Sequence, residues 1–383
     1  MRVLLLSAYD ALSHRYWREG LVSHFDRVDW TVLSLAPRHF SYRVGANPLS
    51  FLSLYQPQLS QHYDLIIATS LVDMARLRGL VPSLADTPLW LYCHENQFAY
   101  PRSPQQHGGE KLDLQLIMPF LYSCLAADKI SFNSGWNRRS TLQGIASLVE
   151  SLPESLVWVA DTIEQRSDVL PVPLSPLSPR ALLSSVAEEV GSDRCTTLLW
   201  NHRWEYDKGP EHLLALVEAL SAAEYPCRLH IVGQQFRRVP AAFDRIAKCL
   251  QQSPSLQLGQ WGYLESTAQY HALLRDSDIV LSTARHDFQG IAVLEAVQAG
   301  CIPLLPAYLV YPELFAADYL YDVGDDPAQC AAHILEKLQH WRQVGLPPRV
   351  DITGLSWDAL RPDYARRLTA LARRQQAQFI AKD

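Results

Sequence analysis

The sequence lacks paired cysteines and long apolar runs. Its seven cysteines are odd in number and widely spread, and no two of them form a CxxC pair. This argues against a disulfide framework and against a zinc site, and it suits a reducing compartment. No uninterrupted apolar run comes near the roughly 18 residues that a membrane span needs. We therefore expect a cytoplasmic protein that does not insert into a membrane.

An excess of positive charge and a metal-binding pattern are also missing. The formal net charge is -6, so a nucleic acid can bind only at a local basic patch. No HxxxH or DxD motif stands in a strand-loop context, and Asp325 with Asp326 lies in a predicted turn. We expect chemistry that needs no metal ion and no cofactor. Four pairs of basic residues are candidates for a patch, although each is also typical of solvated surface: Arg38 with Arg43, Arg102 with Lys111, Arg138 with Arg139, and Arg237 with Arg238.

The chain does contain two series of short apolar strands that alternate with helix-like spans. With 383 residues, 48% of them hydrophobic, it is long enough for two globular domains. Alternation of this kind predicts an α/β fold with two doubly wound, Rossmann-like domains. The predicted strands are Met1–Ser7, Trp30–Ser34, Leu65–Thr69, Leu89–Cys93 and Lys129–Asn133 in the first domain, and Thr197–Trp200, Arg228–Val232, Leu256–Leu258, Ile279–Ser282 and Ile302–Leu305 in the second.

A proline-rich stretch, Asp168–Arg180, separates the two series, and we expect it to hold neither a helix nor a central strand. We expect domains at residues 1–175 and 176–355, with the carboxyl ends of both sheets around one cleft. Residues 356–383 are predicted to form a helix that packs back on the first domain, because Leu360, Tyr364, Leu368 and Leu371 lie on one helical face.

The segment Arg285–Glu295 is the main candidate for ligand binding. If a helix begins near Gly290, the backbone amides of Gln289, Gly290 and Ile291 point out of its N-terminus, where they can bind a phosphate. Asp287, in the loop beside Phe288, can accept hydrogen bonds from sugar hydroxyls, and Glu295 can accept both hydroxyls of a ribose. An ordinary helix start with acidic residues near its positive end is the alternative.

Two further stretches of the second domain complete this candidate donor site. Arg203 and Lys208 lie in one loop after a predicted strand, where they can bind a diphosphate and stabilise a departing nucleotide; ion pairs on a surface loop are the alternative. Trp261 and Tyr263 follow another strand and can stack on a nucleobase, or they form a core aromatic pair.

Polar residues also follow strands of the first domain. His94, Glu95, Asn96 and Gln97 are consecutive after a predicted strand, where four polar side chains suit ligand binding better than packing. His94 can hydrogen-bond a sugar or assist proton transfer, and the other three can read an acceptor. Two further turns are expected to face the cleft and can bind an acceptor or cap a helix: Ser13 with His14, and Asn133 with Ser134.

Five strings, in this order, resemble a known family: YCHENQFAYP, NHRWEYDKGPE, WGYL, RHDFQGIAVLEAVQAGC and LVYPELF. The pattern resembles the family-4 retaining glycosyltransferases of the GT-B fold and, among these, the tRNA-queuosine mannosyltransferases. The resemblance implies transfer of mannose from GDP-mannose to queuosine in the anticodon loop of aspartate tRNA. It places Arg203 and Lys208 on the diphosphate, Asp287 on the mannose, Glu295 on the ribose and His94 near the reacting sugar.

Two departures from the family pattern stand out. The family usually has Glu where Asp287 stands, and the glycine-rich first turn is replaced here by the residues from Asp10 to Ser13. Without glycines that turn cannot approach a phosphate closely, so we expect it to serve acceptor binding or closure. Two other functions remain open at this point: transfer to a lipid-linked or small glycan acceptor, and a non-catalytic scaffold that binds nucleotide sugar or RNA.

Overall fold

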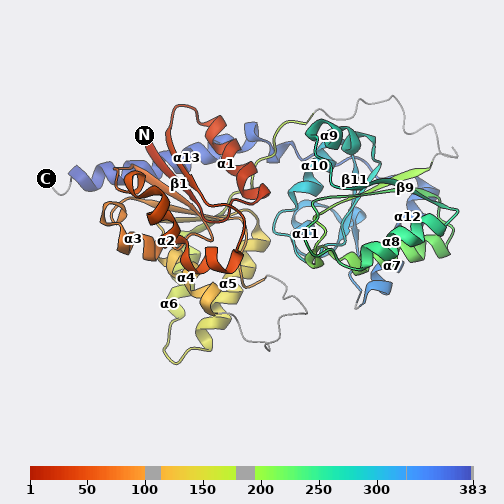
Figure 1. The fold of residues 1–383 in the computed structure, drawn as a ribbon, viewed down its shortest axis with the longest axis horizontal. Coiled ribbons are helices and arrows are strands. Elements are labelled where there is room, and N and C mark those ends of the chain that lie inside the picture. The colour runs from red at the N-terminus through yellow and green to blue at the C-terminus, as the bar shows by residue number, and fades with distance from the viewer. Residues whose placement is uncertain (100–113, 178–194, 325, 381–383) are drawn as a thin grey trace. The chain divides into compact units, whose positions relative to one another are not determined.

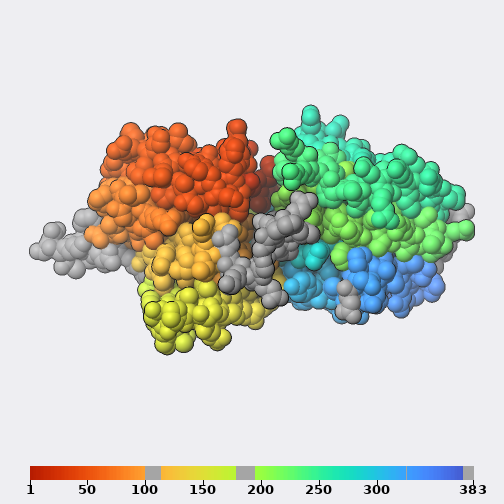
Figure 2. Space-filling view, turned by 60° about the horizontal axis from the view of Figure 1, so that its bottom comes forward, coloured from red at the N-terminus to blue at the C-terminus, as the bar shows by residue number. Residues whose placement is uncertain are grey.

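The computed structural model describes residues 1–99, 114–177, 195–324 and 326–380, with side chains described through residue 373. The chain forms two compact units (Figures 1 and 2). Unit 1 combines Met1–Ser175 with Leu355–Asp383, and unit 2 is Pro176–Gly354. Among the described residues, no helix is long and apolar enough to cross a membrane. Of the basic pairs above, Arg102 with Lys111 lies outside the described residues, as does Asp325.

Unit 1 is built on a six-stranded parallel sheet of order β2-β1-β3-β4-β5-β6. Apolar strands such as β1 and β3 are buried on both faces because helices cover the sheet. The strands are β1 (Arg2–Ser7), β2 (Asp29–Ser34), β3 (Leu65–Thr69), β4 (Leu89–Cys93), β5 (Lys129–Phe132) and β6 (Ser167–Val169). The helices are α1 (Leu12–His24), α2 (Phe40–Leu59), α3 (Met74–Leu80), α4 (Leu114–Ala126), α5 (Gly135–Glu150), α6 (Val157–Arg166) and α13 (Trp357–Ile380).

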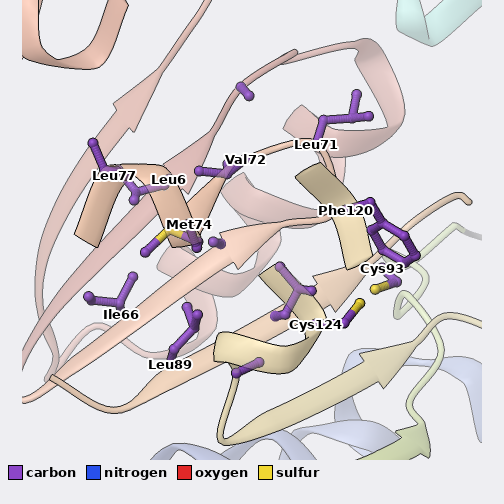
Figure 3. Packing of buried hydrophobic residues seen from close by; sticks show 14 of the residues in the cluster. Leu6, Ile66, Leu71, Val72, Met74, Leu77, Leu89, Cys93, Phe120 and Cys124 are labelled. Atoms are coloured by element: carbon purple, nitrogen blue, oxygen red, sulfur yellow. The ribbon is translucent and has the colours of Figure 1, made fainter. Parts of the chain in front are cut away.

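The core of unit 1 lies between this sheet and the helices α2 to α6 (Figure 3). Leu6 and Ile66 from neighbouring strands meet Met74 and Leu77 of α3, while Phe120 and Cys124 of α4 close the other side. All seven cysteines are free thiols in the structure. Burial raises the pKa of the Cys93 thiol well above its usual value, so this cysteine serves packing.

The last helix, α13, belongs to unit 1 although it follows unit 2 in the sequence. Its Trp357 is buried and stacks on His24 with 4.3 Å between ring centroids. Gly20 of α1 makes room for this ring, since an added Cβ would lie 2.6 Å from it. Farther along, Arg367 pairs with Asp168 of β6 at 2.8 Å.

The linker begins with a short strand that was not predicted. The stretch Asp168–Arg180 was expected to hold neither a helix nor a central strand, and the strand in its first residues, β6 (Ser167–Val169), lies at the edge of the sheet, which that expectation allows. This edge strand ends just before Pro171, which is compatible with the missing amide donor of proline because only one neighbouring strand must be paired. Residues 178–180 of the stretch lie outside the described residues.

Unit 2 repeats the architecture with a parallel sheet of order β12-β11-β10-β7-β8-β9. Its strands are β7 (Thr196–Asn201), β8 (Cys227–Val232), β9 (Leu256–Gly262), β10 (Ile279–Leu281), β11 (Ile302–Pro306) and β12 (Leu320–Tyr321). Its helices are α7 (Pro210–Ala222), α8 (Ala242–Gln252), α9 (Thr267–Asp276), α10 (Ile291–Ala299), α11 (Tyr311–Leu314) and α12 (Pro327–Val344). Two units of this kind make the GT-B fold that the sequence predicts.

Candidate active site

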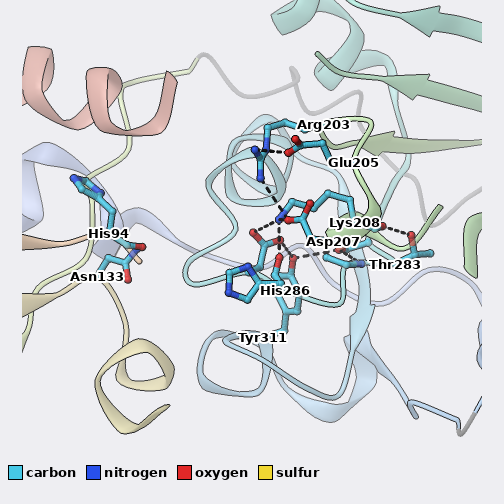
Figure 4. Close-up of polar contacts among 12 residues, drawn as sticks. His94, Asn133, Arg203, Glu205, Asp207, Lys208, Thr283, His286 and Tyr311 are labelled. Atoms are coloured by element: carbon cyan, nitrogen blue, oxygen red, sulfur yellow. Dashed lines mark hydrogen bonds and ion pairs between the residues drawn. The ribbon is translucent and has the colours of Figure 1, made fainter. Parts of the chain in front are cut away.

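The centre of the site in unit 2 is the side chain of Lys208, which closes a short 3-10 turn after β7. Its buried ammonium lies 3.1 Å from Asp287 Oδ1 and 3.2 Å from Asp207 Oδ2. It also donates to the backbone carbonyl of His286 at 2.6 Å (Figure 4). An ammonium has three donors, and all three have partners here. Lys208 therefore fixes the loop that carries Asp287.

A glycine allows the loops after β7 and β10 to meet at this point. Gly209 has a φ of 65°, and an added Cβ would lie 2.0 Å from the carbonyl oxygen of Thr283. Only glycine fits there. Thr283 in turn donates from its hydroxyl to the carbonyl of Lys208 at 2.9 Å and accepts from the Trp200 indole at 2.9 Å. Since β7 and β10 are neighbours in the sheet, these contacts set the two loops in one rigid arrangement.

Asp287 is held on both of its carboxylate oxygens. Besides Lys208 on Oδ1, the hydroxyl of Tyr311 in α11 donates to Oδ2 at 2.7 Å. Burial on its own would raise the pKa of Asp287, but the charge of Lys208 and the hydrogen bonds from Lys208 and Tyr311 outweigh it and lower the pKa. Asp287 is therefore an ionised, firmly oriented carboxylate.

Arg203 lies on the outer side of this cluster. Its guanidinium, with a side chain that is 43% exposed, contacts Glu205 at 2.5 Å and Asp207 at 3.4 Å. Because Asp207 also binds Lys208, one fully buried carboxylate joins both cations. The structure thus brings Arg203 and Lys208, from one loop, together with Asp287, which is distant in the sequence; all three were proposed from the sequence for one site.

Two histidines beside the cluster carry no charge at neutral pH. His202 and His286 are buried, and desolvation lowers the pKa of each to about 4. Phe288 packs edge-on against His286 with 4.4 Å between the ring centroids. These two histidines therefore add nothing to the positive charge of Lys208 and Arg203.

The helix α10 begins as the sequence predicts, with Gly290 at the N-cap and a φ of 72°. Glu295 lies more than a turn into this helix and accepts from the hydroxyl of Tyr270 at 3.2 Å. Asn201 at the end of β7 donates to that same hydroxyl at 3.1 Å and to the carbonyl of Ala292 at 2.7 Å. Burial raises the pKa of Glu295 to about 7, against the hydrogen bond from Tyr270, which lowers it.

Other predicted donor residues have different surroundings. Gln289 is buried, and Ile291 is half-buried at the start of α10. The Trp261 ring packs edge-on against Trp204 at 4.9 Å and lies on the core of unit 2, which favours the packing interpretation. Tyr263 is 55% exposed, and its stacking on a nucleobase stays a prediction.

Three residues of this site went unnoticed as ligands or supports in the sequence: Asn201, Tyr270 and Tyr311. Asn201 is the last residue of a buried strand, so its place at the carboxyl end of the sheet was a usable signal. Tyr311 lies within the string LVYPELF, to which no role was attached. Nothing local marks Tyr270, because its contact with Glu295 depends on how α9 packs against α10.

In unit 1, His94 follows β4 and is enclosed by aromatic rings. The ring centroid of His94 lies 4.4 Å from His14, 4.8 Å from Tyr92 and 4.9 Å from Trp17. Burial, together with the neighbouring His14, lowers the pKa of His94 well below its usual value, so it is a neutral imidazole. Its Nε2 atom has no hydrogen-bond partner in the part of the chain that the structure describes.

The asparagines of this region are occupied by the chain itself. Asn96 donates to Asn137 Oδ1 at 2.8 Å, and its own oxygen accepts two backbone amides. Asn133 donates to the carbonyl of His94 at 2.9 Å and accepts from Asn137 at 2.8 Å. These contacts argue against the expected acceptor binding by Asn96 and Asn133, because their amide groups are used in holding His94 and its loop. Ser134 is the N-cap of α5.

The remaining acceptor candidates are not equivalent. Ser13 is exposed in the first turn of α1, whereas His14 is buried with Nδ1 2.7 Å from the Tyr9 carbonyl. Glu95 and Gln97 are half-buried, and acceptor binding by them stays a prediction. No group of His, Cys, Asp or Glu side chains that could hold a metal ion occurs among the described residues.

Together, the paired parallel sheets and the cluster of cations, carboxylates and a helix N-terminus in unit 2 define a glycosyltransferase of the GT-B class. Family comparison agrees: residues 2–174 match the model for the tRNA-queuosine alpha-mannosyltransferase N-terminal region, and residues 192–343 match the glycosyl transferases group 1 model. The tRNA-queuosine alpha-mannosyltransferase of Drosophila melanogaster is 30% identical over 329 residues, which are 84% of each chain. The chain belongs to the tRNA-queuosine alpha-mannosyltransferase family.

Other similarities are more limited. The GDP-mannose:cellobiosyl-diphosphopolyprenol alpha-mannosyltransferase of Xanthomonas oryzae is 29% identical over 109 residues, 28% of each chain. Among solved structures, Anabaena HepE in complex with UDP has a TM-score of 0.61 at 13% identity, covering 97% of this chain and 100% of that one. An E. coli structure described as trehalose-6-phosphate bound with UDP-2-fluoro glucose has a TM-score of 0.57 at 15% identity, covering 100% and 98%. At such identities the likeness concerns the fold.

Proposed function

We propose that this enzyme transfers mannose from GDP-mannose to queuosine in the anticodon loop of aspartate tRNA, with retention of configuration at the anomeric carbon. Membership of the family supports the acceptor, since the Drosophila relative carries that activity in its name. The name of the Xanthomonas relative supports GDP-mannose as the donor. A cytoplasmic location follows from this proposal, because the acceptor is a tRNA.

The observation that carries the proposal is the cluster around Lys208. Lys208 and Arg203 are joined through Asp207, so both cations lie beside the loop that leads to α10. Glu205 occupies a position on the Arg203 guanidinium that suits a phosphate oxygen equally well. In the proposed complex a phosphate of the donor replaces Glu205 on Arg203, and Lys208 lies beside the developing negative charge of GDP.

The two carboxylates of the segment take different parts of the donor. Asp287, fixed by Lys208 and Tyr311, accepts hydroxyls of the mannose. Glu295 accepts the hydroxyls of the ribose, with Tyr270 holding it in place. We further propose that the reaction is metal-independent, because Arg203 and Lys208 supply the positive charge that a divalent ion would otherwise provide.

For the chemical step we propose front-face attack. A hydroxyl of the cyclopentenediol attacks the anomeric carbon on the face from which GDP departs, and the bond from that carbon to the phosphate oxygen breaks. The departing phosphate takes the proton of the attacking hydroxyl, so no side chain needs to act as a base. Neutral His94, whose buried Nε2 has no hydrogen-bond partner among the described residues, is suited to hydrogen-bond the reacting sugar rather than to carry a charge.

One experiment tests donor, acceptor and reaction together. The protein is incubated with labelled GDP-mannose and either queuosine-containing or queuosine-free tRNA, with and without EDTA, and the nucleosides are identified by mass spectrometry. The expected product is mannosyl-queuosine, formed only from queuosine-containing tRNA and unchanged by EDTA. Transfer to polyprenol-linked glycan in a parallel assay, with none to tRNA, would contradict the proposed acceptor.

A further inference from the structure

A long part of unit 1 contains no carboxylate side chain. The chain as a whole carries 40 acidic residues, yet residues 30–63, which include most of β2 and all of α2, contain no Asp or Glu. The same stretch holds Arg38, His39 and Arg43. The protein as a whole has a net charge of -6, but the side chains of this segment do not repel a polyanion.

The start of this region presents aromatic and basic side chains to solvent. Tyr42 is 55% exposed and Phe40 is 36% exposed, in the first turn of α2. Arg38 and His39 just before the helix are exposed as well. The Arg43 guanidinium lies 5.8 Å from the centroid of the Tyr42 ring, within the range of a cation-π contact. We call Arg38, Phe40, Tyr42 and Arg43 the 38–43 surface.

The 38–43 surface lies at the carboxyl edge of the sheet, on the same side as His94. The Phe40 ring packs edge-on against Tyr9 at 5.4 Å, just after β1. The carbonyl of Tyr9 lies 2.7 Å from Nδ1 of His14, whose ring is 4.4 Å from that of His94. A continuous series of contacts within unit 1 therefore connects the Phe40 ring to the imidazole that we propose for the reacting sugar.

We infer that the 38–43 surface binds the single-stranded part of an RNA acceptor next to the modified nucleoside. This inference rests on the proposed function. Unstacked bases of an RNA loop stack on aromatic side chains with little sequence preference, and arginine binds the phosphates between them. Tyr42 and Phe40 provide the stacking faces, Arg38 and Arg43 provide the charge, and the absence of carboxylates along residues 30–63 removes local repulsion.

The test measures binding of queuosine-containing tRNA by fluorescence anisotropy, without donor, for the full chain and its variants. Tyr42→Ala and Arg38→Ala are expected to weaken binding about 10-fold each, and Tyr42→Phe, which keeps the ring, to bind like the wild type. For Arg38→Ala the slope of log affinity against log salt should fall by about 1. Matched controls are Trp158→Ala, an exposed aromatic of α6, and Arg349→Ala, an exposed arginine of unit 2.

Several outcomes would overturn the inference. If Tyr42→Ala and Arg38→Ala bind tRNA as tightly as the controls, the inference is wrong. It is also wrong if these variants no longer float with phosphatidylglycerol vesicles while their tRNA affinity stays unchanged. Vesicles are included because Leu49 and Leu54, farther along α2, are exposed. GDP binding by both variants should remain at the wild-type value, which shows that they are folded. A wild-type protein that neither binds nor modifies the tRNA refutes the proposed function itself; active wild type with unaffected variants refutes only the 38–43 surface.

Discussion

The two units place different chemistry at the carboxyl edges of very similar sheets. In unit 2 the central group is charged, since the Lys208 ammonium is fixed by the opposite charges of Asp207 and Asp287. In unit 1 the corresponding position is held by His94, a neutral ring enclosed by other rings. The contrast matches the proposed substrates, because a diphosphate needs compensating charge whereas a sugar hydroxyl needs an oriented neutral partner.

Removal of Lys208 is the strongest test of the charged side of this comparison. Lys208→Ala leaves Asp207 and Asp287 without their ammonium and should reduce transfer at least about 100-fold. Because the lost pair is buried, the free energy of unfolding should also fall by about 3 to 5 kcal/mol. Steady-state kinetics and urea unfolding measure the two effects. Lys337→Ala, which removes a lysine bound to two surface carbonyls, is the control; a near-wild-type rate for Lys208→Ala would refute the donor assignment.

The pH dependence of donor binding tests the role of Glu295 in the unit 2 site. Glu295→Ala should also reduce transfer about 100-fold. With a pKa of about 7, wild-type Glu295 is about one-tenth ionised at pH 6 and nine-tenths at pH 8, so the KM for donor should fall about 10-fold as pH rises between them. Glu295→Gln should abolish this dependence. A KM that stays constant in the wild type over this range would show that the ionised carboxylate does not bind the ribose.

The raised pKa of Glu295 also affects stability. The folded state holds the proton more tightly than the unfolded chain, so this contribution is fully present below the ordinary carboxyl pKa and is lost as pH rises through about 7. The free energy of unfolding of the donor-free protein should therefore differ between pH 5 and pH 8 by more in the wild type than in Glu295→Gln.

On the neutral side, His94→Ala should reduce transfer about 10- to 100-fold, the effect of losing one oriented hydrogen bond from a buried site. Since burial lowers the pKa of His94 well below its usual value, protonation of this residue should not affect the rate between pH 6 and 8. The rate of the Glu295→Gln enzyme at saturating donor, measured between pH 6 and 8, tests this, because the titration of Glu295 is then absent. A transition near pH 6.5 that disappears in the His94→Ala, Glu295→Gln double variant would show that His94 is charged in the working range.

The smallest expected effect concerns the support behind His94. The buried hydroxyl of Tyr364 in α13 accepts from the Trp17 indole at 3.0 Å and lies 3.1 Å from the Tyr92 hydroxyl. Trp17 and Tyr92 both pack on His94, so Tyr364→Phe should lower kcat about 3-fold with little change in KM, and should cost about 1 to 2 kcal/mol of stability. Tyr319→Phe, which removes a hydroxyl bound to the Pro348 carbonyl in unit 2, should leave kcat unchanged. Equal kcat values for Tyr364→Phe and Tyr319→Phe would show that α13 does not support the site.

The sequence predicts the fold well because its signals are local. The length and flanks of short apolar runs such as Leu65–Thr69 indicate buried strands, and Gly290 before an apolar span indicates a helix start. The edge strand β6 was missed since three residues beside prolines carry too little pattern. For the site, the motifs and their order predicted that Arg203, Lys208 and Asp287 serve together; the structure brings them into one cluster, and their binding of a donor stays a prediction.

The sequence could not show which side chains form hydrogen bonds with one another. Asn96 looks like a ligand among polar neighbours, and only the folded loop shows its amide bonded to Asn137. The same holds for Tyr270, whose hydroxyl reaches Glu295 across two helices. Such contacts depend on packing between distant segments, which the local sequence pattern does not predict.

The return of α13 to unit 1 has a consequence for how the protein is made. Trp17 and Tyr364 are 347 positions apart in the chain, so the ribosome must synthesise every residue between them before this hydrogen bond can form. Unit 2 is continuous in sequence and can fold as soon as it emerges, whereas unit 1 lacks the contact of Trp357 with Gly20 until α13 has been synthesised. During synthesis, therefore, the half of the enzyme that begins first is completed last.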